Sequence, residues 1–146
     1  MNCSSPLMDL TLAALVLGVS VIVAARTTQP HTRVAVAAAT LHPIASLVLF
    51  YSLALHMHRT LGGWPQTIGQ AGFPPGLKSH ADLAQQTLGS LILACMFAWP
   101  IAALLCMNNS KLRPGLRYLG IYALTSGLSL LAMRFAPEQF LVWWWD

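Results

Sequence analysis

Residues 83–107 of this chain read LAQQTLGSLILACMFAWPIAALLCM, an apolar stretch without a charged side chain. A transmembrane helix needs about 20 such residues to cross the roughly 30 Å hydrocarbon layer of a bilayer. Three further stretches have the same character: Leu7–Ala25, Val34–Leu55 and Leu116–Met133. The pattern predicts an all-α fold, in which four transmembrane helices form an up-down bundle and residues 1–146 make a single integral-membrane domain.

The composition agrees with a bilayer as the surrounding solvent. Hydrophobic residues make up 56% of the chain and charged residues 8%, whereas a soluble domain is about 25% charged. The net charge of +4 reflects scarce acidic residues and not the clustered basic patch that binds nucleic acid. The chain shows no nucleophile motif, acid–base pair or phosphate-binding loop, so we expect a non-enzymatic protein whose first partner is the lipid bilayer.

The loop charges predict an orientation, because Lys and Arg are more frequent in cytoplasmic loops. One side of the predicted bundle carries Arg26, Arg33, Lys111, Arg113 and Arg117, and the other carries Arg59, Lys78 and Arg134. We therefore expect the first and third loops in the cytoplasm and both termini outside. Residues 1–6 contain no Lys or Arg, so residues 7–25 are expected to remain as a helix and not to be cleaved as a signal peptide.

Aromatic residues gather at the predicted outer surface. The loop Arg59–His80 contains Trp64 and Phe73 among many Gly and Pro residues, which disfavour a regular helix. We expect this loop to form an ordered cap at the membrane surface. The tail, residues 137–146, is too short to span the bilayer and contains Trp143, Trp144 and Trp145. These tryptophans predict an interfacial anchor, with a docking surface for a larger partner as the alternative.

A layer of polar side chains is predicted inside the membrane. Pro43 in the second span and Pro100 in the third each remove a backbone hydrogen bond and kink the helix, at a similar depth. Near this level the sequence places Thr40, His42, Trp99, Thr125 and Ser126. Ser and Thr hydroxyls can satisfy the carbonyls that the prolines free. The alternative is a small polar pocket between kinked helices, which suits a lipid-soluble headgroup such as a quinone.

His42 has two interpretations. An ionisable residue inside a span is a functional candidate, here for ligand binding or proton transfer. A neutral histidine can also bridge helices through hydrogen bonds. Small residues form rows on three spans, and such rows allow close packing or a partner subunit. On the second span they are Ala38 and Ser46, on either side of His42. The third span has Ser90, Ala94, Ala98 and Ala102, and the fourth has Ala123 and Gly127.

Three histidines, His56, His58 and His80, lie near the predicted outer surface. One interpretation is a single b-type haem held by His80 and by His56 or His58. A second is a zinc or copper site formed by His56, His58, His80 and Asp82. Because side chains two residues apart point about 200° apart on a helix, this metal site requires the second span to end before His58. The third interpretation is that these residues only fasten the outer loop.

The segment Arg59-Thr60-Leu61-Gly62-Gly63-Trp64-Pro65, followed by Phe73-Pro74 and His80, resembles a family of small four-span proteins of the bacterial inner membrane. Those proteins have a basic residue, Leu-Gly and then Trp-Pro after the second span, and their function is uncharacterised. The resemblance covers this segment and the span pattern. It implies a bacterial inner-membrane location and supplies no activity or catalytic residue. In such a membrane, the bias of the loop charges places both termini on the periplasmic side.

Together these features predict a small accessory or interaction protein. Its partner is expected to be a larger membrane complex, another membrane protein or a second copy of the chain. The alternative is a haem- or quinone-type redox or ligand-binding module that uses His42, His56 and His80. A small transporter is the third interpretation, which is weakened because no acidic residue lies mid-membrane to couple ions.

Overall fold

The structure, a computed structural model, describes residues 30–65 and 69–146, and every element in these ranges is helical. In chain order they are α2 (Pro30–Leu61), α3 (Pro75–Leu93), the π-helical turn η1 (Ala94–Ala98), α4 (Trp99–Asn108), the 3-10 turn η2 (Arg113–Gly115), α5 (Leu116–Met133) and α6 (Glu138–Trp145). The predicted all-α class is confirmed for this part of the chain.

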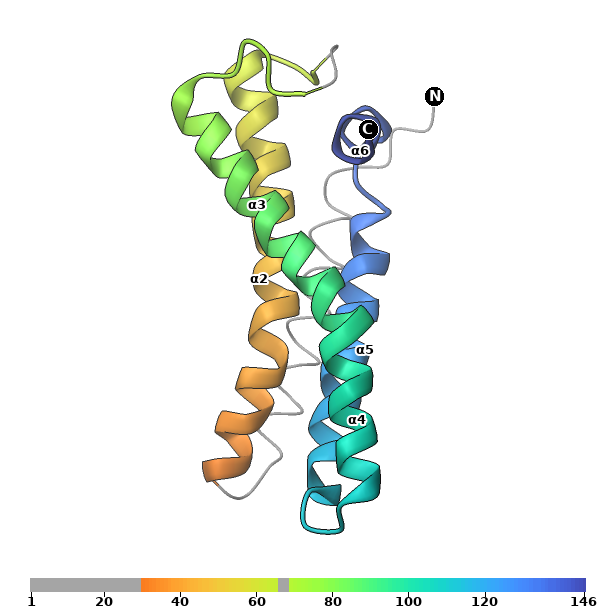
Figure 1. Cartoon of the computed structure of the whole chain (residues 1–146). Helices are drawn as coiled ribbons and strands as arrows, with labels where there is room; N and C mark the ends of the chain where they lie inside the picture. The colour runs from red at the N-terminus through yellow and green to blue at the C-terminus, as the bar shows by residue number, and fades with distance from the viewer. Residues whose placement is uncertain (1–29, 66–68) are drawn as a thin grey trace.

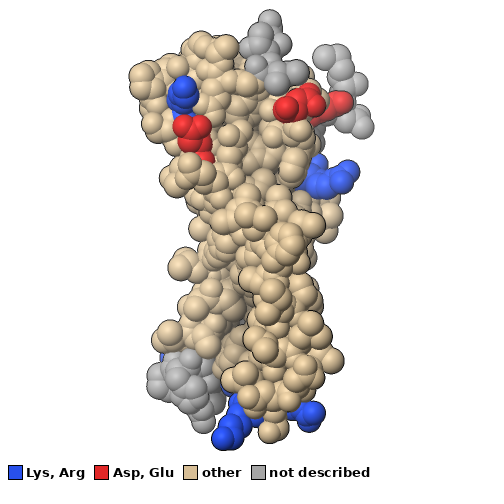
Figure 2. Space-filling view, viewed as in Figure 1, with Lys and Arg blue, Asp and Glu red and all other residues tan. Residues whose placement is uncertain are grey.

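Three helical segments of the described chain are long and apolar enough to cross a membrane. They are Arg33–Leu61, Pro75–Asn108 and Arg113–Met133, and the second of them joins α3, η1 and α4. On the face seen in Figure 2, the charged side chains lie toward the two ends of the molecule, with an uncharged middle between them. This distribution suits a bilayer, because charges are costly in hydrocarbon. The first predicted span, Leu7–Ala25, lies outside the described residues.

Two helices extend beyond the apolar spans predicted within them. α2 continues beyond Leu55 to Leu61, and the third helix begins at Pro75 and not at Leu83. Proline suits the first turn of a helix, because its fixed φ is helical and its missing N–H needs no partner there. The outer loop therefore shortens to residues 62–74, where Gly62, Gly69 and Gly72 have positive φ, a conformation that other residues disfavour. The last predicted span, 116–133, coincides with α5.

The two halves of the third span, α3 and α4, pack on different helices. α2 packs against both α3 and α5, whereas α4 packs on α5. Figure 1 shows the α2–α3 loop and α6 at one end of the molecule and the α4–α5 loop at the other. We call these the α6 end and the basic end, the latter after Lys111, Arg113 and Arg117 of its loop region. Toward the basic end, α2 diverges from α4 and α5 (Figure 1).

The two internal prolines act differently. Pro43 lies within an uninterrupted α-helix, whereas Pro100 follows the π-helical turn, in which the Trp99 N–H donates to the Ala94 carbonyl. Proline cannot donate to the carbonyl four residues earlier, and a π turn lengthens the hydrogen-bond spacing to five residues. The third span thus accommodates its proline by a local change of helical register. A simple kink had been predicted in each helix.

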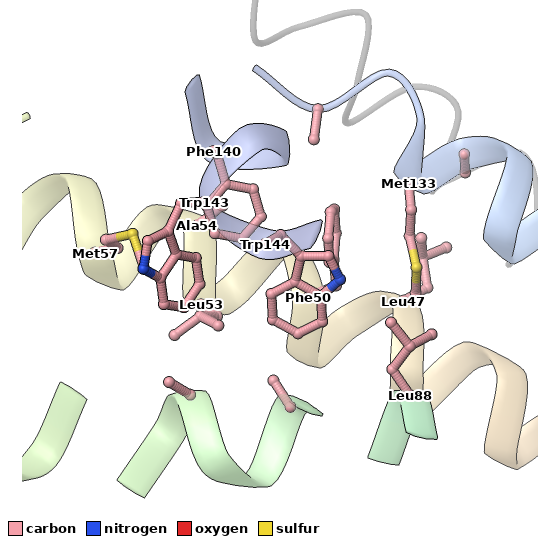
Figure 3. Close-up of a cluster of buried hydrophobic side chains, with 14 of the residues drawn as sticks. Leu47, Phe50, Leu53, Ala54, Met57, Leu88, Met133, Phe140, Trp143 and Trp144 are labelled. Atoms are coloured by element: carbon pink, nitrogen blue, oxygen red, sulfur yellow. The ribbon is translucent and has the colours of Figure 1, made fainter. Parts of the chain in front are cut away.

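The C-terminal tail is a helix that packs on the protein's own core. Figure 3 shows Phe140 and Trp144 of α6 close to Phe50 of α2. The Phe50 ring lies 5.0 Å from that of Phe140 and 5.1 Å from that of Trp144, between centroids, within the range in which aromatic pairs attract. Phe140, Trp143 and Trp144 are buried. Of the three tryptophans predicted to anchor the tail or to bind a partner, Trp145 is the exposed one.

Candidate functional site

His42 connects three helices in the middle of the molecule. From α2, its Nε2 lies 2.9 Å from Ser90 Oγ and 3.4 Å from the Thr87 carbonyl oxygen, both on α3. Its Nδ1 lies 3.2 Å from the Tyr122 hydroxyl oxygen on α5. A neutral imidazole has one N–H donor and one acceptor nitrogen, so a single tautomer can serve both neighbours. These contacts are the interhelical hydrogen bonds that one of the two interpretations of His42 requires.

The other members of the predicted polar layer have separate partners. Thr40 and Thr125 each donate to the carbonyl four residues earlier in their own helix, at 3.0 and 2.8 Å. The Trp99 Nε1–H donates to the Leu119 carbonyl at 2.8 Å and links α4 to α5. Ser126 is buried, and its hydroxyl interacts with the side chain of Tyr122, four residues earlier on α5.

A pocket lies between the π-helical turn and α5. It measures about 260 Å³ and is lined by Cys95, Trp99, Ala123, Ser126, Gly127 and Leu130. Pockets for drug-sized ligands measure about 300–1,000 Å³, so this one suits a single-ring group or a short section of chain. Two residues of the predicted polar layer, Trp99 and Ser126, therefore line a pocket, and Thr40, His42 and Thr125 lie elsewhere.

His56 and His80 meet between α2 and α3 at the α6 end. Their Nδ1 atoms are 3.0 Å apart, and the Nε2 of His80 lies 3.1 Å from Ser52 Oγ. The Ser52 hydroxyl also donates to the Leu49 carbonyl at 3.1 Å. A hydrogen bond between two imidazole nitrogens needs one protonated and one unprotonated nitrogen. The contact is therefore a polar link between α2 and α3 that carries a single shared proton.

His58 and Asp82 take no part in this contact. α2 continues past His58 to Leu61, and the His58 ring lies beside Trp64, with 4.8 Å between centroids. Asp82 Oδ1 accepts a 2.8 Å hydrogen bond from Gln70 Nε2. Within the described ranges, no three His, Cys, Asp or Glu residues form a group able to hold a metal ion. The predicted four-residue zinc or copper site is not formed, because the helix does not end where that site required.

The contact between His56 and His80 is also too close for a haem. Two imidazole nitrogens that share one metal lie about 4 Å apart, since each metal–nitrogen bond is about 2.0 Å. The facing nitrogens here are 3.0 Å apart, and Leu53, Met57 and Ala81 beside them in the chain are fully buried. As they stand, these side chains leave no space for a porphyrin, so their geometry fits an interhelical hydrogen bond and not haem ligation.

Trp64 and Phe73 fasten the outer loop to the aromatic core. The Trp64 ring lies 5.9 Å from Phe140, and the Phe73 ring lies 5.6 Å from Trp143, between centroids. The Trp143 Nε1–H donates to the Gly69 carbonyl at 2.8 Å. Loop and tail therefore hold each other at the α6 end, a contact between segments that the sequence analysis treated separately.

Comparisons with protein-family models, with curated proteins and with solved structures found no match. The sites are therefore interpreted from their own chemistry. Ser52 and Tyr122 were not predicted as histidine partners, and Cys95 was not predicted as a pocket residue. For the pocket, the Trp99-Pro100 pair was the available signal, because a proline within a span accompanies local changes of helical register.

Proposed function

We propose that this protein is a small accessory protein of the bacterial inner membrane, which binds a transmembrane helix of a larger membrane complex through its third span. The exposure of that span carries the proposal. In its most apolar stretch, 6% of the residues are buried within the described protein, compared with 33% and 28% in the spans that contain α2 and α5. Among the three described spans, the third therefore offers the most surface to a partner.

The exposed surface is concentrated on α4 and the turn before it. Met96, Phe97, Ile101, Leu104 and Leu105 are 58–63% exposed. Lipid alone can cover such side chains. Here, however, they alternate with Ala98, which is exposed, and Ala102, which is half-buried. Small residues four apart let the backbone of a second helix come close, which favours a protein partner over lipid at this surface.

The rest of the fold makes this surface rigid. His42 ties α3 to α2 and α5, and the hydrogen bond from Trp99 to the Leu119 carbonyl ties α4 to α5. A surface that is already ordered loses less conformational entropy on binding. This supports a recognition role for the third span. The redox alternative with His56 and His80 has less support, since their 3.0 Å contact fits a hydrogen bond between α2 and α3.

Photo-crosslinking tests this proposal. We expect benzoylphenylalanine in place of Leu104 on α4 to capture a protein partner in native membranes, identified by mass spectrometry after mild detergent extraction. The matched control is the same photoreactive residue in place of Leu41 on α2. Leu41 is 69% exposed but lies outside the third span, so it is expected to capture lipid and no stoichiometric protein.

Two outcomes contradict the accessory role. Capture of lipid alone from position 104 would remove the evidence for a partner at the third span. A crosslink between two copies of this chain would favour self-association, and with it the small-transporter interpretation, because four-span transporters usually work as dimers.

A further inference from the structure

We propose that His56 and His80 form an acid-sensitive contact, which holds α2 and α3 together at the α6 end and opens when both imidazole rings are protonated. The two rings face each other across the two helices, with 3.0 Å between their Nδ1 atoms. This inference is independent of the accessory role, because it concerns the contact between α2 and α3 and not the exposed surface of α4.

The hydrogen bonds around the contact assign its protons. Ser52 donates its single hydroxyl proton to the Leu49 carbonyl at 3.1 Å. Its oxygen can therefore only accept from the Nε2–H of His80, which lies 3.1 Å away. A neutral His80 that is protonated on Nε2 has a bare Nδ1. His56 must then donate from its Nδ1–H, and its own Nε2 is left without a proton.

This assignment makes the two protonation steps of the pair unequal. A first added proton binds the Nε2 of His56 and leaves the hydrogen bond between the rings in place, now with a charged donor, which strengthens it. A second proton has one position left, the Nδ1 of His80, where it replaces the acceptor by another donor. Two N–H groups then face each other on two positive rings. Strongly interacting groups titrate as a pair in two steps, and the second step opens the contact.

The second charge has no counter-charge in the contact. Two unit charges about 4 Å apart near a protein surface repel each other enough to shift an equilibrium by about 1,000-fold. Asp82 lies two residues after His80, about 200° around α3, and accepts a hydrogen bond from Gln70. Arg59 lies three residues after His56 on α2 and adds a like charge, which is destabilising at this spacing.

The other titratable side chains described at the α6 end lie outside the contact. His58 lies beside Trp64, and the Tyr51 hydroxyl donates to the Ala132 carbonyl at 2.7 Å. The remaining charged side chains are exposed, and they are Lys78 on α3, Arg134 after α5, Glu138 on α6 and Asp146 at the end of the tail. The proton-dependent step is therefore confined to the two facing rings.

Opening of the contact changes the surface of this end, because apolar side chains surround the two histidines. Leu53 and Met57 on α2 and Leu77 and Ala81 on α3 are fully buried. Their burial opposes separation of the helices, so the contact stays closed while it carries one charge or none. Separation after the second proton exposes these side chains, and acid thus converts a closed apolar interface into an accessible one.

Distance measurements between two spin labels test the proposal. In a background without the native cysteines, labels are attached at Thr60→Cys on α2 and Gly76→Cys on α3. Both positions are exposed, and a Cβ at Gly76 meets no atom within 4 Å. The full chain in lipid nanodiscs is brought from about pH 7.5 to about pH 5, the range in which histidine gains its charge. We expect a population with a longer distance, which grows about tenfold per pH unit while it is minor, because one further proton drives the opening.

Matched variants identify the responsible groups. Glutamine keeps a donor and an acceptor but does not titrate. His56→Gln and His80→Gln are therefore each expected to abolish the acid-induced population and to retain the short distance at neutral pH. His58→Gln removes an exposed histidine of the same helix that is outside the contact, and it is expected to keep the full response. Nitrogen-15 NMR of the rings is an independent measurement, in which neutral His80 is expected to be protonated at Nε2 and bare at Nδ1.

A distance between the labels that stays the same over this pH range would overturn the proposal. An acid response that persists in His80→Gln would assign it to other groups, and one that disappears in His58→Gln would assign it to His58. A proton on the Nδ1 of neutral His80 would contradict the assignment that makes the two steps unequal. The crosslink from position 104 involves none of these groups, so the accessory role and this inference fail separately.

Discussion

His42 uses both ring nitrogens on neighbouring helices, toward Ser90 at 2.9 Å and Tyr122 at 3.2 Å. Interhelical hydrogen bonds in membrane proteins contribute about 0.6 kcal/mol on average and at most about 1.7 kcal/mol. We therefore expect His42→Leu to lower the free energy of unfolding by about 1–2 kcal/mol, measured by unfolding in mixed detergent micelles. The control Leu41→Ala changes a neighbouring side chain that is 69% exposed and is expected to have little effect.

A double-mutant cycle with Tyr122→Phe assigns this effect to its contact. If the ring and the phenol interact as their distance indicates, the two substitutions are non-additive by about 0.6–1.7 kcal/mol. Strict additivity would mean that the contact contributes nothing. A stability unchanged in His42→Leu would favour the other interpretation of this residue, in which its nitrogens serve a ligand or a proton.

Among the elements, α5 shows where a sequence is informative. It begins at Leu116 after Arg113-Pro114-Gly115 and ends at Met133 before Arg134, so charges and turn residues mark both limits. The residues up to His80 were expected to belong to the outer loop, because proline breaks the interior of a helix. However, proline also favours a helix start, and α3 begins at Pro75. The π-helical turn was hidden for another reason. The third span is apolar on all sides around residues 94–98. A change of helical register there leaves the order of polar and apolar residues looking the same, so the sequence does not reveal it.

The candidate sites were predictable only as far as single residues. His42 stood out as an ionisable residue inside a span, but its contact with Tyr122 depends on how α2 and α5 pair. His56 and His80 were expected near one surface, yet the 3.0 Å distance between their Nδ1 atoms, which fits a direct hydrogen bond, follows from helix packing. The pocket at Trp99 depends on the π-helical turn, and sequence periodicity does not show that turn.

α6 depends strongly on one aromatic side chain. Phe140 is fully buried, with its ring 5.0 Å from Phe50 and 5.9 Å from Trp64. Truncation of a buried phenylalanine costs about 3–5 kcal/mol, so we expect Phe140→Ala to release α6 and to speed its cleavage by chymotrypsin in detergent. Val142→Ala, at a 54% exposed position of the same helix, is the control. A tail that stays protected in Phe140→Ala would show that Trp143 and Trp144 hold α6 without it.

The molecule as a whole is electrically asymmetric. In the described chain, the acidic residues Asp82, Glu138 and Asp146 belong to the helices and tail of the α6 end, and the loop region of the basic end contains Lys111, Arg113 and Arg117. Figure 2 shows acidic side chains toward one end only of the visible face. Because loops rich in Lys and Arg remain in the cytoplasm, we expect the basic end inside the cell and the α6 end outside.

Cysteine accessibility distinguishes the two orientations. In a background without Cys3, Cys95 and Cys106, we expect Gln139→Cys on α6 to react with a membrane-impermeant maleimide in intact cells. Ser110→Cys, in the loop before α5, is expected to react only after the membrane is permeabilised. The reversed result would invert the orientation and place the His56–His80 contact at the cytoplasmic surface. Reaction of both positions in intact cells would show insertion in two orientations, which means that the excess of Lys and Arg at the basic end is too small to decide the topology.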